Sequence, residues 1–346
     1  MHRRVLLTTV VALLAALALV AAAPGVAQAQ AQLKLNHQWP ATTPGSAVDQ
    51  WFADEVAKRT ANEVQVKIFW SEALGKAKEN LQLVKSGAID MAAMSPAYFP
   101  SDLPFFTAPN SLPMAMDNIR QAGIIMRTLM EKVPAYAEEA KTNNLKPLFF
   151  HHLNPYLLVC KEPVRALADL KGKKIRTWGE DMPRLMQAAG GTGVTIFLPE
   201  IYENLQRGVV NCAPFSVDLI QTYKIYEVAK YVTEVVAWEG PSWGVWINLD
   251  RWNKLPDKHK QTMLAVADEA NKRDLQAVGE AADKARAFLA QNGVQFIPFA
   301  ESERLKWVQA NPDFFADWIN KMEKLGKGAA ARQTVAIWKE LREKHR

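Results

Sequence analysis

One arginine in this sequence stands where an anion could be bound. Arg176 lies in KKIRTW, residues 173–178, a short run of strand-forming residues. A strand in a soluble domain usually keeps its charges at its ends or on a wet face, so Arg176 is either solvated or held to bind an anion. A guanidinium offers a flat fork of donors that fits a carboxylate and stays charged at every relevant pH. The run alone leaves both interpretations open.

Aromatic residues form a second group of interest, because most fall at predicted strand ends or in loops. Core packing explains any one of them. Taken together at the mouths of the sheets, they fit an apolar cleft with a few polar anchors. The set comprises Trp39, Trp70, Tyr98, Tyr156, Trp178, Phe197, Phe215, Trp238, Trp243 and Trp246.

A short internal similarity points to two halves of similar construction. GAIDMAAMS, residues 87–95, and GVVNCAPFS, residues 208–216, both follow a segment containing ENLQ. Both predict a buried strand that ends in serine, which would bring Ser95 and Ser216 to one crevice, where open α/β sheets bind ligands. Coincidence between short apolar strings is the alternative.

Several catalytic and metal-binding patterns fail on their context. GPSWG, residues 240–244, matches a nucleophile elbow, but Ser242 precedes an alternating, strand-like run where the elbow needs a helix. His151 and His152 lack a companion at metal-ligand spacing. The sequence holds no Walker loop and no G-x-G-x-x-G. We therefore expect no enzyme, no metal site and no cofactor.

The elements that must position these residues alternate between strand and helix, which indicates two α/β layers with parallel strands. No Ser/Gly-rich linker separates the two halves of the chain. We therefore expect structured strands to cross between two domains and to act as a hinge. Residues 257–293 predict a helix of some nine turns, long enough to brace both domains. Strands are predicted at 33–37, 64–70, 88–95, 145–152, 155–164, 173–178, 194–198, 209–216 and 232–238, and shorter helices at 47–60, 78–87, 180–191, 199–208 and 217–231.

The start of the chain predicts export. MHRR is basic, an apolar run follows, and Ala27-Gln28-Ala29 is a small-residue cleavage site, the order of a secretory signal peptide. A membrane anchor is the weaker alternative, because Pro24 and Gly25 interrupt the end of the apolar run. We expect cleavage near Ala29 and a periplasmic protein.

The charge balance bears on the class of partner that the chain could bind, and the two cysteines bear on whether it contains a disulfide. The formal charge is +6, with 42 Lys and Arg against 36 Asp and Glu, and no basic cluster indicates nucleic acid. Cys160 and Cys212 sit in strand-like runs at no telling spacing. A disulfide and two buried thiols are both open, and we favour buried thiols.

The central block of the chain resembles a known family. Residues 170–212 are similar to DctP-type solute receptors of tripartite ATP-independent periplasmic (TRAP) transporters. The sequence of this block is LKGKKIRTWGEDMPRLMQAAGGTGVTIFLPEIYENLQRGVVNC. Further similarities are LNHQWP, EALGKAKENLQLVKSGAIDMAAMSPAYF and WINLDRWNKLP. The resemblance extends over essentially the whole mature chain.

The resemblance implies a two-lobed periplasmic binding protein fold, with two α/β domains linked by crossing strands and a long C-terminal helix. On this basis residues 1–29 are the signal peptide, 30–153 with 242–281 form domain I, and 154–241 with 282–346 form domain II. The family's hallmark arginine, which pairs with the substrate carboxylate, maps to Arg176. The substrate-binding residues that we expect are Arg176, Trp178, Trp39, Ser95, Tyr98, Asn154, Tyr156, Phe197, Phe215 and Ser216.

Departures from the family pattern bear on the ligand. Many members carry a second arginine after the first crossing, where this chain has Pro155 or Tyr156, and the polar residues that often end the block are Pro214-Phe215. We therefore expect a monomeric receptor that binds an aromatic or apolar monocarboxylate and serves TRAP membrane subunits. The alternatives are a C4-dicarboxylate or a hydroxy- or keto-acid as ligand, or a receptor that presents its ligand to a signalling protein.

Overall fold

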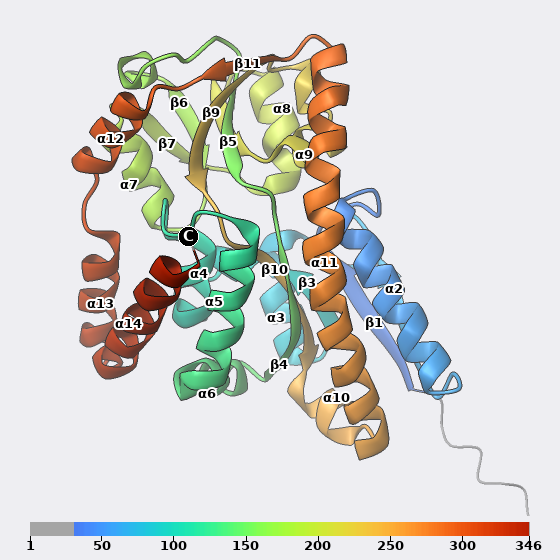
Figure 1. The fold of residues 1–346 in the computed structure, drawn as a ribbon. Helices are drawn as coiled ribbons and strands as arrows, with labels where there is room; N and C mark the ends of the chain where they lie inside the picture. Colours follow the sequence, from blue (N-terminus) through green and yellow to red (C-terminus); the bar gives the residue numbers. More distant parts are fainter. Residues whose placement is uncertain (1–30, 346) are drawn as a thin grey trace, which may run out of the picture.

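The computed structural model of the protein describes residues 31–345, so the expected signal peptide at residues 1–29 lies outside the described residues. Two mixed β-sheets, each covered by helices, form two lobes (Figure 1). This confirms the predicted two-lobed α/β fold. The sheet of the first lobe has the order β2 (Val64–Phe69), β1 (Ala31–His37), β3 (Met91–Met94), β10 (Pro241–Asn248), β4 (Leu145–His152). The sheet of the second lobe has the order β11 (Gln295–Pro298), β9 (Tyr231–Trp238), β5 (Tyr156–Cys160), β8 (Cys212–Phe215), β6 (Lys174–Thr177), β7 (Thr192–Thr195).

The expectation of parallel strands holds for only part of each sheet. β1 pairs in parallel with β2 and β3, and β6 pairs in parallel with β7 and β8. β10 is antiparallel to β3 and β4, and β5 is antiparallel to β8 and β9. The antiparallel strands are those next to the crossings, because a chain that leaves one sheet and later returns enters it in the opposite direction.

The helices of the first lobe form where apolar residues recur at three-and-four spacing. In α5 the side chains of Ala122, Ile125, Met126 and Leu129 are buried on one face, and Asn118 caps its start by accepting a hydrogen bond from the backbone N–H of Gln121. The helices of this lobe are α2 (Pro44–Arg59), α3 (Asn80–Ser86), α4 (Pro104–Ser111), α5 (Ile119–Lys132), α6 (Pro134–Thr142) and α10 (Leu249–Lys254).

The second lobe differs from the sequence-based expectation at one helix. A helix was predicted over 217–231, but the helix there, α9 (Val217–Thr222), is shorter, and a separate 3₁₀ turn follows at Ile225–Glu227. Between them Lys224 takes a left-handed conformation with φ of 53°, which an α-helix does not accommodate. Apolar residues recur at helical spacing on both sides of Lys224, so the sequence pattern gave no sign that the helix is interrupted there. The other helices of this lobe are α7 (Asp181–Ala188), α8 (Ile201–Gln206) and α12 (Glu301–Ala310).

Four segments of the described chain pass between the lobes, and one of them is residues 311–313, which join α12 to α13 (Phe314–Lys324). Residues 153–155 join β4 to β5, residues 239–240 join β9 to β10, and α11 (Asp257–Gln291) contacts α2 and β4 of the first lobe and α9 of the second. The predicted crossing strands and long bracing helix are therefore present. No helix within residues 31–345, α11 included, combines the length and apolar character needed to cross a bilayer.

The last helices do not pack as expected. Residues 282–346 were assigned to domain II, and β11 does join that sheet. However, α13 (Phe314–Lys324) and α14 (Gly328–Lys344) lie beside α4 and α5 of the first lobe (Figure 1). The Trp338 indole N–H donates to the carbonyl of Ala115, and the ring of Trp318 contacts that of Phe105.

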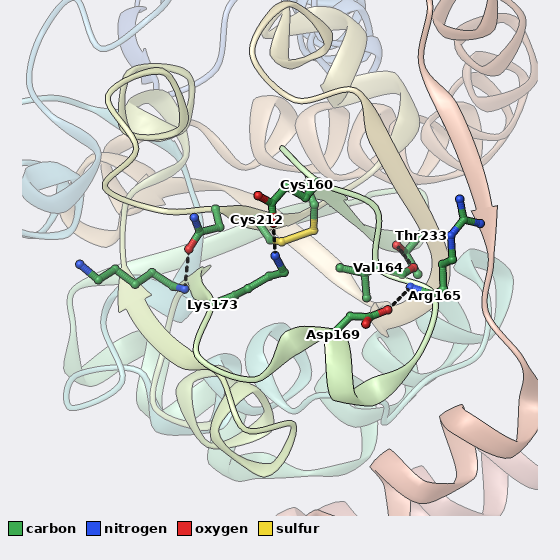
Figure 2. The surroundings of a disulfide bond; sticks show 10 residues. Cys160, Val164, Arg165, Asp169, Lys173, Cys212 and Thr233 are labelled. Atoms are coloured by element: carbon green, nitrogen blue, oxygen red, sulfur yellow. Dashed lines mark hydrogen bonds and ion pairs between the residues drawn. A yellow bond between two sulfur atoms is a disulfide. The ribbon is translucent and has the colours of Figure 1, made fainter.

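The two cysteines form a disulfide, and the preference for buried thiols was wrong. Cys160 of β5 and Cys212 of β8 are opposite each other in an antiparallel pair, with their Cα atoms 4.1 Å apart (Figure 2). This register brings the sulfur atoms together, and the spacing of the two residues in sequence does not reveal it. Cys212 also pairs with Ile175 in β6, the neighbour of Arg176, so the bond ties together the strands that carry the second lobe's site residues.

We expect replacement of both cysteines by alanine to destabilise the second lobe. The bond closes a loop with a sequence separation of 52 residues, for which chain entropy predicts a loss of about 4 kcal/mol in the free energy of unfolding. Thermal denaturation of the double variant beside the oxidised wild type measures this. Detection of two free thiols in the unfolded, unreduced protein would show that the bond does not form.

Candidate functional site

A cavity lies in the seam between the two lobes. Its volume is about 20 Å³, roughly the room that one water molecule needs. An organic ligand of several carbon atoms therefore requires the lobes to separate before it can enter. The lining residues are Trp39, Ser95, Tyr98 and Asn110 from the first lobe and Tyr156, Arg176, Trp178, Leu198 and Trp238 from the second.

Strand ends bring most of these side chains to the seam. Trp39 follows β1, Ser95 follows β3 and Trp178 follows β6, while Trp238 ends β9 and Tyr156 begins β5. Parallel strands of open α/β sheets end at one edge, and ligands bind in the crevice outside that edge. The two lobes present these edges to each other, which places both sets of residues in one cavity.

Arg176 is buried at the centre of the site. Its side chain is only 2% exposed, and no carboxylate of the described residues lies within ion-pair distance of it. Its Nε–H donates to the carbonyl of Ile196 at 3.0 Å, and its guanidinium lies 4.4 Å from the ring centre of Trp178. Burial lowers the pKa of Arg176, and the neighbouring Tyr98 and Tyr156 partly oppose that shift. The sequence left open whether this arginine is solvated, and in the structure it is not.

Three N–H donors of the lining residues have no hydrogen-bond partner among residues 31–345. They are Nη1 of Arg176, Nε1 of Trp39 and Nε1 of Trp238, and all three are buried. Guanidinium and indole nitrogens donate and cannot accept. A buried donor without a partner costs about 1–3 kcal/mol, so this cavity is chemically suited to a molecule that brings several acceptor oxygens.

Acidic groups near the cavity are held toward their neutral forms. Burial raises the pKa of Tyr98 and of Tyr156. It also raises the pKa of Glu239, which follows Trp238 at the second crossing, and that of Asp218. Asp218 and Glu239 both act electrostatically on Tyr156. Arg176 acts in the opposite direction and lowers the pKa of both tyrosines, although by less than burial raises it.

Direct contacts hold the seam together. The Trp178 indole N–H donates to the carbonyl of Asn110 at 3.2 Å, and the backbone N–H of Leu198 donates to the hydroxyl of Tyr98 at 3.2 Å. The ring of Tyr98 also packs edge-on against Phe197 at 4.7 Å between ring centres. Each contact joins one lobe to the other, so opening the cavity breaks all three.

A buried ionic chain supports the first-lobe wall. His151 lies between Asp49, at 2.8 Å, and Asp274, at 2.6 Å, and Asp49 also contacts His37 at 2.7 Å. Burial opposes charge on His151, but the two carboxylates raise its pKa to about 10. Burial would likewise raise the pKa of Asp49, yet His151 and His37 lower it to about 2. His151 is therefore an imidazolium held between two carboxylates.

This imidazolium reaches the cavity through two stacked rings. His151 stacks on Trp243 at 4.3 Å, and Trp243 stacks on Trp39 at 4.2 Å. Asp274, on the other side of His151, belongs to α11. The position of Trp39 in the cavity lining thus depends on the ion pairs of His151 with Asp49 and Asp274. The pair with Asp274 also anchors α11.

The structure brings six of the ten predicted site residues to the cavity and leaves four outside its lining. Asn154 is at the first crossing, where its amide donates to Asp218 and to the carbonyl of Val278, both at 2.8 Å. Phe197 packs against Tyr98, Phe215 lies behind Tyr156, and Ser216 is buried at the start of α9. The six lining residues are Trp39, Ser95, Tyr98, Tyr156, Arg176 and Trp178.

Three lining residues were not among the predicted ligands. Trp238 stood in the aromatic set, and its place at the end of a predicted strand was the signal for it. Asn110 belongs to α4, for which no helix was predicted, and Leu198 contributes from the turn before α8. Neither has a residue type or spacing that would single it out.

The rejected patterns have structural roles. Ser242 lies within β10, so the strand, turn and helix of a nucleophile elbow are not formed there. His151 belongs to the ionic chain described above. Among the described residues, no group of three or more His, Cys, Asp or Glu side chains is placed to hold a metal ion.

Solved structures share this fold. One is a TRAP periplasmic solute-binding protein from Desulfovibrio salexigens, an open complex with the C-terminus of a symmetry mate bound in its ligand-binding site. Its sequence is 25% identical to this chain and the TM-score is 0.77. The match covers 92% of this chain and 97% of that one. A second protein from Desulfovibrio salexigens, with bound orotic acid, has a TM-score of 0.81 at 21% identity over 90% of this chain and 99% of that one.

Comparison of sequences identifies the family. The chain is 31% identical to the uncharacterized protein y4mM of Sinorhizobium fredii over 229 residues, which are 64% of this chain and only 42% of that longer protein. The family model of bacterial extracellular solute-binding protein family 7, DctP, matches residues 35–321. This chain therefore belongs to the DctP family of extracellular solute-binding proteins.

Proposed function

We propose that this chain is a periplasmic receptor that binds a monocarboxylate with an apolar or aromatic body and delivers it to the membrane subunits of a TRAP transporter. The observation that carries the proposal is the set of buried, unpartnered N–H donors around Arg176. A carboxylate supplies the acceptors that these donors lack and the negative charge that the guanidinium lacks. Closure over the pair removes water and strengthens its attraction.

The number of charges in the cavity favours a single carboxylate. Arg176 is the only lysine or arginine among the lining residues. Lys78 is exposed outside the cavity, and Arg184 pairs with Asp181 and Asp317. A second carboxylate would be buried without a cation, which costs several kcal/mol.

The walls favour an apolar or flat body. Trp39, Tyr156, Trp178 and Trp238 present ring surfaces to the cavity, and a well-placed ring pair contributes about 0.5–1.5 kcal/mol beyond burial of area. The orotic acid bound by the similar Desulfovibrio salexigens protein is a flat ring with one carboxylate. That likeness is consistent with the proposal, although the two chains share only 21% of their residues.

A hydroxy- or keto-acid is the second candidate. The unpartnered Nε1 atoms of Trp39 and Trp238 would each be satisfied by an oxygen beside the carboxylate. Such an acid still carries one charge, so it meets the same restriction at Arg176. A screen of organic acids for an increase in melting temperature separates the two candidates.

We expect Arg176→Ala to weaken binding of the best acid from that screen at least 100-fold, or about 3 kcal/mol, because the ligand carboxylate would be buried without a cation. Arg176→Lys should recover little, since an ammonium lacks the planar fork. Isothermal titration calorimetry measures both.

Arg207→Ala is the matched control for the loss of one arginine. Its guanidinium is exposed and pairs with Glu203 one helical turn away in the same lobe, so the affinity should change less than about twofold. Near-native affinity of Arg176→Ala would remove the basis of the proposal.

Selectivity should follow from the single cationic anchor. In competition experiments we expect benzoate to displace the bound acid at lower concentration than succinate or malate, because either diacid buries a second charge. The readout is the inhibition constant of each competitor at one pH. A tenfold preference for the four-carbon diacids would contradict the single-anchor model.

Ligand binding should shift the population of lobe arrangements toward the closed one. Small-angle scattering should then give a smaller radius of gyration with saturating acid than without it. Arg176→Ala at the same acid concentration should keep the larger radius. An unchanged radius for the wild type at saturation would argue against hinge closure.

A further inference from the structure

A second and larger cavity lies on the first lobe, away from the seam. Its volume is about 500 Å³, within the range of small-molecule sites. Most of its lining residues belong to α5, β4 and α11. None of its lining residues belongs to the cavity around Arg176.

The walls of this cavity are mainly apolar. Met126 and Met130 contribute from α5, Leu148 and Phe149 from β4, and Leu275 from α11. Leu264 at its edge is 40% exposed, one of few large apolar side chains so open to water. An apolar guest would therefore remove apolar area from water on both sides of the contact.

The charged residues at the mouth neutralise one another to a large extent. Arg127 of α5 pairs with Asp268 of α11 at 2.9 Å, and Lys272 pairs with the same carboxylate at 2.8 Å. All three side chains are about half exposed or more. Arg127 and Asp268 join the two helices across the mouth. Arg120 and Glu131 also line the cavity, and all five charged lining residues are exposed to solvent, so none of them is a buried charged anchor in the interior.

One buried polar atom faces this interior without a partner. His152 of β4 is 3% exposed and lines the cavity. Neither of its ring nitrogens has a hydrogen-bond partner among the described residues, and Nε2 is the one next to Gly123 of the cavity lining. Gly123 of α5 leaves this nitrogen uncovered, since a Cβ at that position would lie 3.6 Å from Nε2 and 3.4 Å from Leu275. A buried polar atom in such a position calls for a polar group on the guest.

The other ring nitrogen sets the hydrogen-bonding role of Nε2. Nδ1 lies 3.4 Å from Oδ2 of Asp274, whose carboxylate also accepts from the backbone N–H of His152 at 2.8 Å. Burial would raise the pKa of Asp274, but His151 and His152 lower it, so the group is a carboxylate. In the neutral form of an imidazole only one nitrogen carries a proton, and the nitrogen that faces a carboxylate is the one favoured, so Nε2 is the acceptor of that form.

We propose that the cavity between α5 and α11 binds an uncharged apolar molecule bearing one hydroxyl group, such as an alkylphenol, whose O–H donates to Nε2 of His152. The apolar body packs on the methionine and leucine side chains of the walls. The site is independent of Arg176 and of the carboxylate ligand.

The test uses 4-propylphenol and its methyl ether, 4-propylanisole, as a matched pair. The two differ in the donor and are similar in apolar body. We expect calorimetry to show saturable binding of one phenol per chain and at least tenfold weaker binding of the ether. Arg176→Ala should bind the phenol as the wild type does, which separates this site from the carboxylate site.

Two substitutions locate the site. Gly123→Leu fills the space in front of Nε2 and should weaken phenol binding at least tenfold. Gly123→Ala, whose Cβ lies 3.6 Å from Nε2 but leaves most of the cavity open, should give a smaller loss in the same direction. His152→Phe keeps a ring of similar shape and should abolish the preference for phenol over ether. The thermal midpoint of each variant verifies that it is folded.

Each contrary result rejects a stated part of the proposal. Absence of saturable phenol binding, or binding that is unchanged in a folded Gly123→Leu, would show that the cavity is not the site. Equal affinity for phenol and ether in the wild type would show that Nε2 does not accept a hydrogen bond from the guest.

Discussion

A full positive charge buried without a counter-ion is the constraint around which the seam is organised. Arg176 is held by one carbonyl and one indole ring, and no carboxylate of the described residues pairs with it. Burial of an unpaired charge is costly, so the rest of the fold must keep it in place. The Cys160–Cys212 bond fixes the strands beside it, and the lobes close over it through Trp178 and Tyr98. The protein thus carries a cost that the carboxylate ligand proposed above would offset.

On the first-lobe side of the seam, the buried charge is compensated. His151 is charged, but it is compensated on both sides by Asp49 and Asp274. This cluster is a rigid support, because removing any member would leave another buried charge unpaired. One lobe therefore holds a satisfied charge and the other an unsatisfied one. In the proposed function the unsatisfied charge of Arg176 sets ligand selectivity, while the satisfied charge of His151 supports Trp39 and α11.

The features that were predicted correctly are those encoded in a local sequence pattern or in the family resemblance. These are the two-lobed fold, the crossings, the long helix and the place of Arg176, because periodicity and a specific block encode them. Prediction failed where the outcome depends on register or tertiary contact. The disulfide needs Cys160 and Cys212 opposite each other in two strands that are distant in sequence. The break at Lys224 and the contribution of Asn110 depend on how neighbouring elements pack, which no short window of residues records.

The position of β10 has a consequence for the order in which the lobes can fold. This strand lies between β3 and β4 in the first sheet, yet the chain reaches it only after all of β5 to β9 has been made. The second lobe can assemble five of its six strands from one continuous segment, residues 156–238. The first lobe must wait with a gap in its centre, bordered by two strand edges whose backbone groups are unpaired. A chain that ends before residue 241 would expose those edges to pairing with other chains, which makes aggregation the expected fate of truncated products.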